Sequence, residues 1–153
     1  MSQMAQVKHA AAPAADNSVK ALINLHMSSL DTLRGFEKMV DKAEPAFLAV
    51  VQRFAALHLR QVVRMDAMVR EMGGVPDQNG SFIGSLNRAI VGLLAVFNAV
   101  DEDTMDQVRS GERHVLAAFD RALMCSLPQG HRQALTQMRA DLAKLLADTR
   151  NVN

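Results

Sequence analysis

The stretch from Ala46 to Met72 constrains this chain more than any other, because it is a long helical pattern without glycine or proline. It reads AFLAVVQRFAALHLRQVVRMDAMVREM, which makes about seven and a half turns of α-helix. Steps of four and three residues mark one side of it, as on a buried helix face: Phe54, His58, Gln61, Met65, Met68 and Met72. The sequence therefore predicts a long core helix, and whether its two polar core residues form a site is the functional question.

The composition also favours packed helices. Hydrophobic residues make up 49% of the 153 residues and include ten Met, whereas aromatic residues make up only 4%. Ala and unbranched side chains lose little entropy in a helix, and no segment shows the sustained alternation of a strand. The predicted fold class is therefore all-α, and the length suits a single domain with one core.

Residues 1–16 differ from the rest of the chain. They are rich in Ala, contain Pro13 and show no clean apolar stripe. We expect them to be a mobile tail. Residues 17–153 are then the single domain.

Proline and glycine mark the ends of the first two helices. Asn17 or Ser18 can cap the first helix, and Pro45 ends it near residues 41–44, because the residue before a proline disfavours helical geometry. Pro45 can also be the first residue of the second helix. Gly73-Gly74-Val75-Pro76 ends that second helix, since glycine supplies a left-handed cap and proline prevents continuation.

The second half of the chain predicts one short helix and two long ones. Residues 81–98 are apolar around much of the helix, so one side should cover the bundle and another can meet a partner. Asp101-Glu102-Asp103 places negative charge at the start of the third long helix. Leu127-Pro128 separates it from the last helix, with Pro128 suited to a first helical position.

The connection lengths predict the architecture. Tight links join the first long helix to the second and the third to the fourth, whereas the stretch from Gly73 to about Glu102 is long enough to travel back along the bundle. The second and third long helices can therefore run in parallel. This is the arrangement of a ferritin-like four-helix bundle with one long crossover, here containing a short fifth helix.

Metal sites in such bundles follow a pattern of one Glu from each of two helices and an E-x-x-H pair from each of the other two. Glu37 and Glu112 match the single glutamates in type and approximate level. The remaining positions depart from the pattern, because they read His58-x-x-Gln61 and Asp141-x-x-Lys144.

A candidate metal site thus comprises Glu37, His58, Glu112 and Asp141. An amide is a poor replacement for a carboxylate, and the charge of Lys144 competes with a cation. The set could hold one iron or other divalent ion weakly, but not a strong dinuclear centre. The alternative is a polar layer in which His58 and Glu112 satisfy each other and fix the helix register. Glu37, at the edge of its row, is the residue most expected to point to solvent.

Several classes of function are disfavoured. A net charge of +1 gives no indication of nucleic-acid binding. The longest apolar run, Ala89 to Val100, is well short of the about 20 residues that span a bilayer. The N-terminus lacks the apolar region of a secretory signal, and the single cysteine, Cys125, excludes an internal disulfide. We expect a cytoplasmic protein.

The sequence resembles a bacterial ferritin-like family known only as a domain of unknown function. The resemblance spans roughly Val19 to Arg150, and these motifs carry it: Met72-Gly73-Gly74-Val75-Pro76, Gly80-Ser81, Ser110-Gly111-Glu112 and Leu127-Pro128. It implies a ferritin-like bundle in a bacterial cytoplasm, without an established activity. Glu112 is the one site position that it carries over.

We therefore expect a non-catalytic helical protein with a binding or stress-related role, self-associating through residues 81–98. The alternative is a metal-dependent redox or storage protein with a mononuclear or di-iron site. A third hypothesis is an interaction module that binds another bacterial protein through Leu93 and Leu94.

Overall fold

The fold is entirely helical in the part of the chain that the structure describes. The computed structural model describes residues 2–76 and 102–150. These residues form four helices and no strand: α1 (Ser2–Val40), α2 (Pro45–Glu71), α4 (Glu102–Leu123) and α5 (Gln129–Asp148). The predicted all-α class is confirmed for these residues. The predicted short helix at 81–98 lies outside them.

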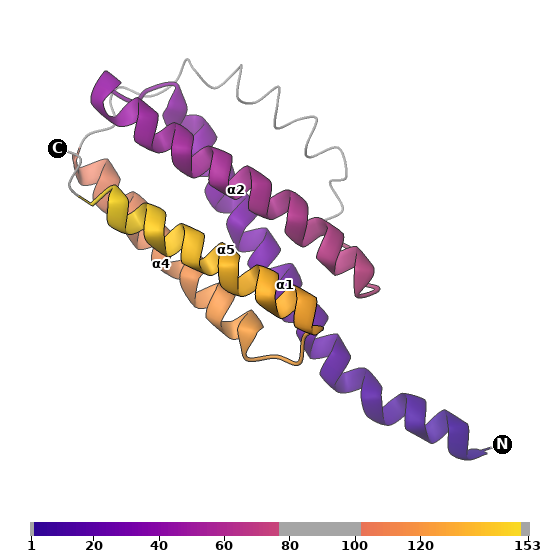
Figure 1. The fold of residues 1–153 in the computed structure, drawn as a ribbon. Helices are drawn as coiled ribbons and strands as arrows, with labels where there is room; N and C mark the ends of the chain where they lie inside the picture. Colours follow the sequence, from indigo (N-terminus) through magenta and orange to yellow (C-terminus); the bar gives the residue numbers. More distant parts are fainter. Residues whose placement is uncertain (1, 77–101, 151–153) are drawn as a thin grey trace.

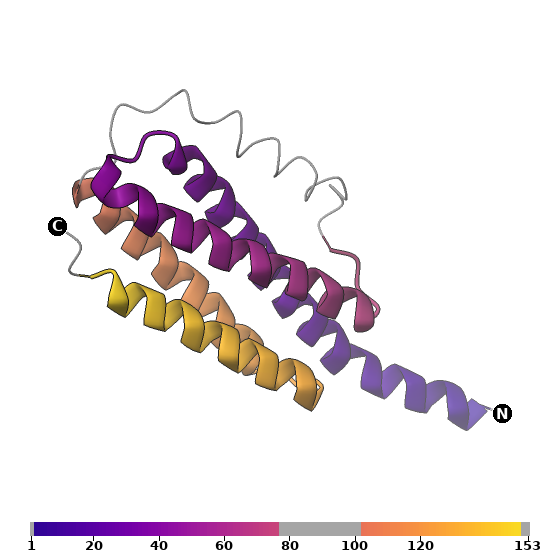
Figure 2. The ribbon, with the colours of Figure 1, turned by 45° about the horizontal axis from the view of Figure 1, so that its top comes forward.

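The four helices pack as a bundle in which each contacts two neighbours (Figures 1 and 2). α1 and α5 each pack against both α2 and α4, so α1 lies diagonal to α5 and α2 lies diagonal to α4. Neighbouring helices run in opposite directions, and diagonal helices run in the same direction (Figure 1). α2 therefore ends at the opposite end of the bundle from the start of α4. The predicted parallel orientation of these two helices is observed.

Local chemistry sets both ends of α2. Pro45 stands in its first turn, where a missing backbone N–H costs nothing. At the other end, Gly73 has a φ of +79° and its N–H donates to the Arg70 carbonyl. The next position has no room for a side chain, because a Cβ at Gly74 would lie 2.5 Å from Cγ1 of Val19. Both ends agree with the prediction to within a residue.

Two other helix starts differ from the prediction. α1 begins at Ser2 rather than at Asn17 or Ser18, since the surrounding Ala residues favour helix strongly enough to continue past Pro13. Its first turns extend beyond the other helices (Figure 1). Pro128 is the residue before α5, not its first residue. The division into a tail at 1–16 and a domain at 17–153 stays a prediction.

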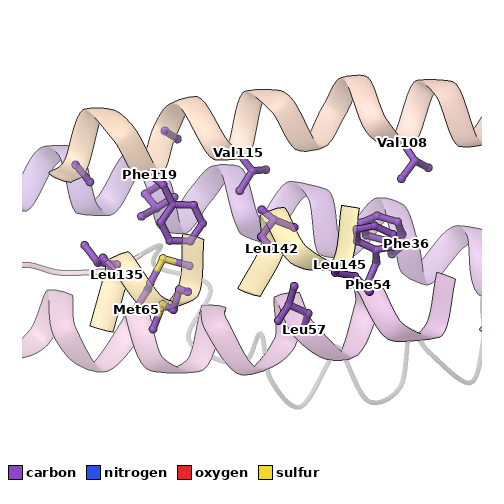
Figure 3. Close-up of a cluster of buried hydrophobic side chains, with 14 of the residues drawn as sticks. Phe36, Phe54, Leu57, Met65, Val108, Val115, Phe119, Leu135, Leu142 and Leu145 are labelled. Atoms are coloured by element: carbon purple, nitrogen blue, oxygen red, sulfur yellow. The ribbon is translucent and has the colours of Figure 1, made fainter. Parts of the chain in front are cut away.

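The main core fills the space between the four helices (Figure 3). Phe36 of α1 stacks on Phe54 of α2, with ring centroids 5.0 Å apart. Further along, fully buried side chains come from α2, α4 and α5: Met65, Met68, Val115, Phe119, Leu135 and Leu142. Burial of each large apolar side chain contributes about 1.5–3 kcal/mol, so this core supplies most of the stabilisation.

A second, smaller cluster lies between α1 and α2, apart from the main core. Its buried members are Leu30, Leu33 and Val62. Leu30 lies on the row formed by Ile23, Leu30 and Glu37, which runs along the edge of the buried face of α1. α1 therefore buries a wider face than a single row of apolar residues.

Polar contacts hold the helix pairs together at the surface. Arg139 of α5 donates from two nitrogens to Asp120 of α4, at 2.6 and 3.1 Å, and this contact lowers the pKa of Asp120. Arg132 donates to the carbonyls of Leu123 and Cys125, which closes the α4–α5 turn. Exposed pairs of this kind contribute about 0–1 kcal/mol each, so they orient the helices more than they stabilise them.

Among the described residues, α2 alone is long and apolar enough to cross a membrane by length and composition. In its most apolar stretch of 18 residues, 44% is buried within the bundle. A core helix passes the same test, and its buried face here includes Phe54 and Met65. This finding is consistent with the prediction of no membrane span.

Candidate functional site

A histidine and a glutamate meet in the centre of the bundle. His58 of α2 and Glu112 of α4 have no solvent-exposed surface, and His58 Nε2 lies 2.7 Å from Glu112 Oε1. With the carboxylate ionised, Nε2 is the donor. The pair joins the two diagonal helices, whose backbones do not approach closely. It is thus a direct polar connection across the core.

The rings and helices around this pair hold it in place. Phe36 stacks on the imidazole of His58, with centroids 5.6 Å apart and 21° between the planes. One turn further along α2, the Gln61 side chain donates from Nε2 to the Met138 carbonyl of α5 at 2.9 Å. The polar core residues therefore connect α2 to both α4 and α5, in surroundings where hydrogen bonds are stronger than in water.

Three atoms of this polar core have no hydrogen-bond partner among the described residues. They are Nδ1 of His58, Oε2 of Glu112 and Oε1 of Gln61, and all three are buried. A buried polar atom without a partner costs about 1–3 kcal/mol. The polar core therefore retains the capacity for further hydrogen bonds or for a ligand.

Glu37 is buried, contrary to the prediction that it would be the candidate most expected to face solvent. Only 1% of the residue is exposed, and its Oε1 has no hydrogen-bond partner within the described ranges. Burial raises the pKa of Glu37 to about 7, against the opposing charge of Arg34. Glu37 lies two turns from Leu30 on the same edge row of α1. The sequence did not predict the burial of Glu37, because whether an edge row is buried depends on the helices that pack beside it.

Asp141 lies at the surface, away from the buried pair. It is exposed and accepts a hydrogen bond from Gln137 at 2.8 Å. It lines a groove of about 440 Å³ between α2 and α5 together with Arg53, Arg60 and Lys144. Lys144 likewise points outward, where it pairs with Asp148 at 2.6 Å.

The structure thus joins two of the four candidate metal ligands, His58 and Glu112. In residues 2–76 and 102–150, no group of three or more His, Cys, Asp or Glu side chains is placed to hold a metal ion. The contacting atoms of the two joined side chains bind each other. The four predicted residues therefore do not form one ligand set in this conformation.

The comparisons with known proteins give one match. A family model described as a domain of unknown function (DUF2383) matches residues 17–125. The chain belongs to the DUF2383 family. No curated protein and no solved structure matches it.

The range of the DUF2383 match bears on the candidate site. It includes Glu37, His58, Gln61 and Glu112, whereas Asp141 and all of α5 lie beyond it. The buried pair is therefore contained in the part of the chain that defines the family, and the surface groove with Asp141 is completed by residues outside it.

Proposed function

We propose that this protein is a ferritin-like helical bundle with a non-catalytic binding or stress-related role, in which a buried His–Glu pair takes the place of a metal site. The observation that carries the proposal is the contact of 2.7 Å between His58 and Glu112, both fully buried. Each group supplies the other with a partner, so the pair fixes the relative position of two helices whose backbones do not approach closely.

The ferritin-like assignment is supported by the order and direction of the helices. α1 and α2 form one antiparallel pair, α4 and α5 form another, and α2 runs parallel to α4 (Figure 1). Bundles with one long crossover have this arrangement, whereas a simple up-down-up-down bundle does not. The inward-facing His58 and Glu112 then occupy positions where metal-binding bundles of this class carry ligands.

Elemental analysis tests the metal side of the proposal. The full chain, purified without chelator or a histidine tag, should contain iron, manganese and zinc at far below one equivalent. A matched preparation of E112Q gives the background. About one equivalent of a single metal in the natural chain, lost in E112Q, would contradict the proposal.

A mononuclear metal protein is the second candidate, and the unpartnered atoms favour it. His58 Nδ1, Glu112 Oε2 and Gln61 Oε1 are buried and still able to bind. Titration of the metal-free chain with Co²⁺, followed by visible absorption, would detect such a site. If the protein binds one metal ion at the buried pair, Co²⁺ should give a d–d absorption band that disappears in H58L. The band should persist in D141N, because Asp141 lies at the surface. A featureless titration excludes it for Co²⁺.

Self-association is part of the proposal and rests on the sequence of residues 81–98, which is apolar over much of a helical circumference. We propose that the chain forms homo-oligomers in a bacterial cytoplasm through these residues. Light scattering at micromolar concentration should give a mass above one chain, reduced to one chain by L93E or L94E. Capture of a protein partner that survives both substitutions would argue against a binding role for this segment.

A further inference from the structure

Three arginines surround a hollow of about 320 Å³ between α4 and α5, away from the buried pair. Arg109 and Arg113 come from α4, and Arg150 follows the end of α5. The other lining residues are apolar: Leu116, Ala143 and Leu146. Among the described residues, no acidic side chain lines this hollow.

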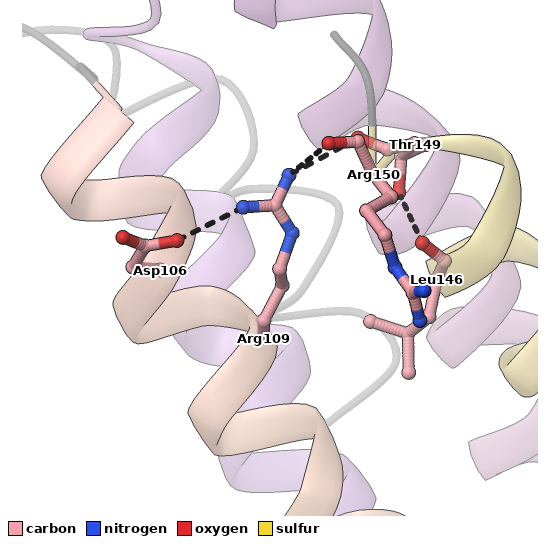
Figure 4. A network of polar contacts seen from close by, with 5 residues as sticks. All are labelled: Asp106, Arg109, Leu146, Thr149 and Arg150. Carbon is pink, nitrogen blue, oxygen red and sulfur yellow. Dashed lines mark hydrogen bonds and ion pairs between the residues drawn. The ribbon is translucent and has the colours of Figure 1, made fainter.

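Arg109 is held in place by three bonds (Figure 4). Its Nη1 donates to Asp106 at 3.0 Å, and its Nη2 donates to the carbonyls of Thr149 and Arg150 at 3.3 and 3.1 Å. The Nε of Arg109 is buried and has no hydrogen-bond partner in the described part of the chain. The guanidinium is thus fixed at the edge of the hollow with two of its five N–H donors unused, one of them the buried Nε–H.

The other two arginines have exposed side chains and no ion pair with any described residue. Arg113 is four residues from Arg109, so the two like charges lie on the same face of α4. Like-charge pairs at this spacing destabilise a helix by a few tenths of a kcal/mol. Asp106 offsets one of the three charges. Within the described residues, the cluster therefore keeps a net positive charge that can attract an anion.

The groove between α2 and α5 provides a contrast. It also carries three basic side chains, from Arg53, Arg60 and Lys144, but Asp141 and Asp148 line the same groove. Lys144 pairs with Asp148 there. That groove largely neutralises its own charge, whereas the hollow between α4 and α5 does not.

We propose that the hollow lined by Arg109, Arg113 and Arg150 binds the phosphate group of a phosphate monoester. Guanidinium groups match the geometry and charge of phosphate oxygens better than an ammonium does. The apolar part of the ligand lies on Leu116, Ala143 and Leu146, so an organic phosphate binds more tightly than inorganic phosphate. A soluble monoester and a lipid headgroup share this chemistry, and the experiment separates them.

Calorimetric titration of the full chain with phenyl phosphate at low ionic strength tests the proposal. We expect saturable binding that R113Q and R150Q each weaken about tenfold, the effect of losing one charge-assisted contact. Both side chains are exposed, so neither substitution disturbs the fold. R64Q is the matched control, because Arg64 is an exposed arginine on α2; it should change the affinity less than about twofold.

Sedimentation with phosphatidylcholine vesicles that contain phosphatidic acid forms the second arm. Binding of phenyl phosphate that depends on Arg113 supports a soluble ligand, and binding of vesicles alone, with the same dependence, supports a lipid headgroup. Absence of saturable binding in both arms overturns the proposal. An equal loss of affinity in R64Q also overturns it, because the attraction would then be diffuse charge rather than a site.

Discussion

Glu37 and Glu112 are both buried, but in the described part of the chain only Glu112 has a basic group within hydrogen-bond distance. Its Oε1 lies 2.7 Å from His58, whereas Glu37 has a buried oxygen without a hydrogen-bond partner in the described ranges. An ionised group in a core needs a partner to offset its lost hydration. The two residues therefore predict opposite effects of removing the charge.

Removal of one member of the buried pair should be strongly destabilising. In H58L the Glu112 carboxyl loses its partner, which costs about 3–5 kcal/mol. The double variant H58L/E112L should lose less than H58L alone, because no uncompensated charge remains. Urea unfolding of the wild type, both single variants and the double variant measures the coupling. Additive losses would contradict the role given to the pair.

Removal of the Glu37 charge should stabilise the protein at neutral pH and above. The pKa of Glu37 is about 7 in the folded chain against 4.5 otherwise, so between these values the folded chain holds a proton that the unfolded chain releases. Stability therefore falls as the pH rises from about 4.5 to about 7, by at most about 3 kcal/mol. E37Q should lack this loss.

The measurement is urea unfolding of E37Q and the wild type from pH 4.5 to pH 8. E44Q is the matched control, because Glu44 is exposed and makes no side-chain cap bond. The advantage of E37Q over the wild type should grow with pH, while that of E44Q stays flat. An advantage that shrinks with rising pH would show that Glu37 gains a partner when ionised.

At the scale of helices, glycine positions with different surroundings predict substitutions of opposite sign. A Cβ at Gly74 would lie 2.5 Å from Val19 and 3.0 Å from Val69, so G74A should cost about 1–3 kcal/mol. Gly35 lies within α1 with open space around its Cβ position, so G35A should gain about 0.5–1 kcal/mol. Thermal unfolding measures both. A stabilised G74A would mean that the Val19 and Val69 side chains move aside easily.

The ends of α2 could be predicted from sequence because they depend on local chemistry. Pro45 and Gly73 act through their own backbone restrictions, which hold in any tertiary context. The buried face of α5 also follows the helical spacing of its apolar residues. Its buried residues are Leu135, Met138, Leu142 and Leu145, and Asp141 is the residue before Leu142 and is not among them. Asp141, which the ligand pattern places in the candidate metal site, is exposed in this conformation.

The burial of Glu37 and the extension of α1 to Ser2 could not be read in the same way. Whether an edge row is covered depends on neighbouring helices, and Leu30 and Glu37 share such a row. The contact between His58 and Glu112 is one of the two alternatives that the sequence predicts. That the two side chains contact each other is seen only from the distance of 2.7 Å between them.

At the scale of the whole molecule, the sequence predicted the direction of the helices from the lengths of their connections. The short links make α1–α2 and α4–α5 antiparallel pairs, and the long stretch between Glu71 and Glu102 allows α2 and α4 to run in parallel. Connection length limits orientation without regard to side-chain detail. This explains why the arrangement was predicted while individual side chains were not.

The contact between diagonal helices has a consequence for the rate at which the chain opens. His58 and Glu112 are 54 residues apart in sequence, whereas the α1–α2 and α4–α5 pairs form from helices that are adjacent in the chain. Local contacts form early and distant ones late, so the pair should close after the folding transition state. H58L should then accelerate unfolding and leave the folding rate nearly unchanged in stopped-flow urea jumps. The lifetime of the folded state, rather than the time needed to reach it, would be set in the middle of α2.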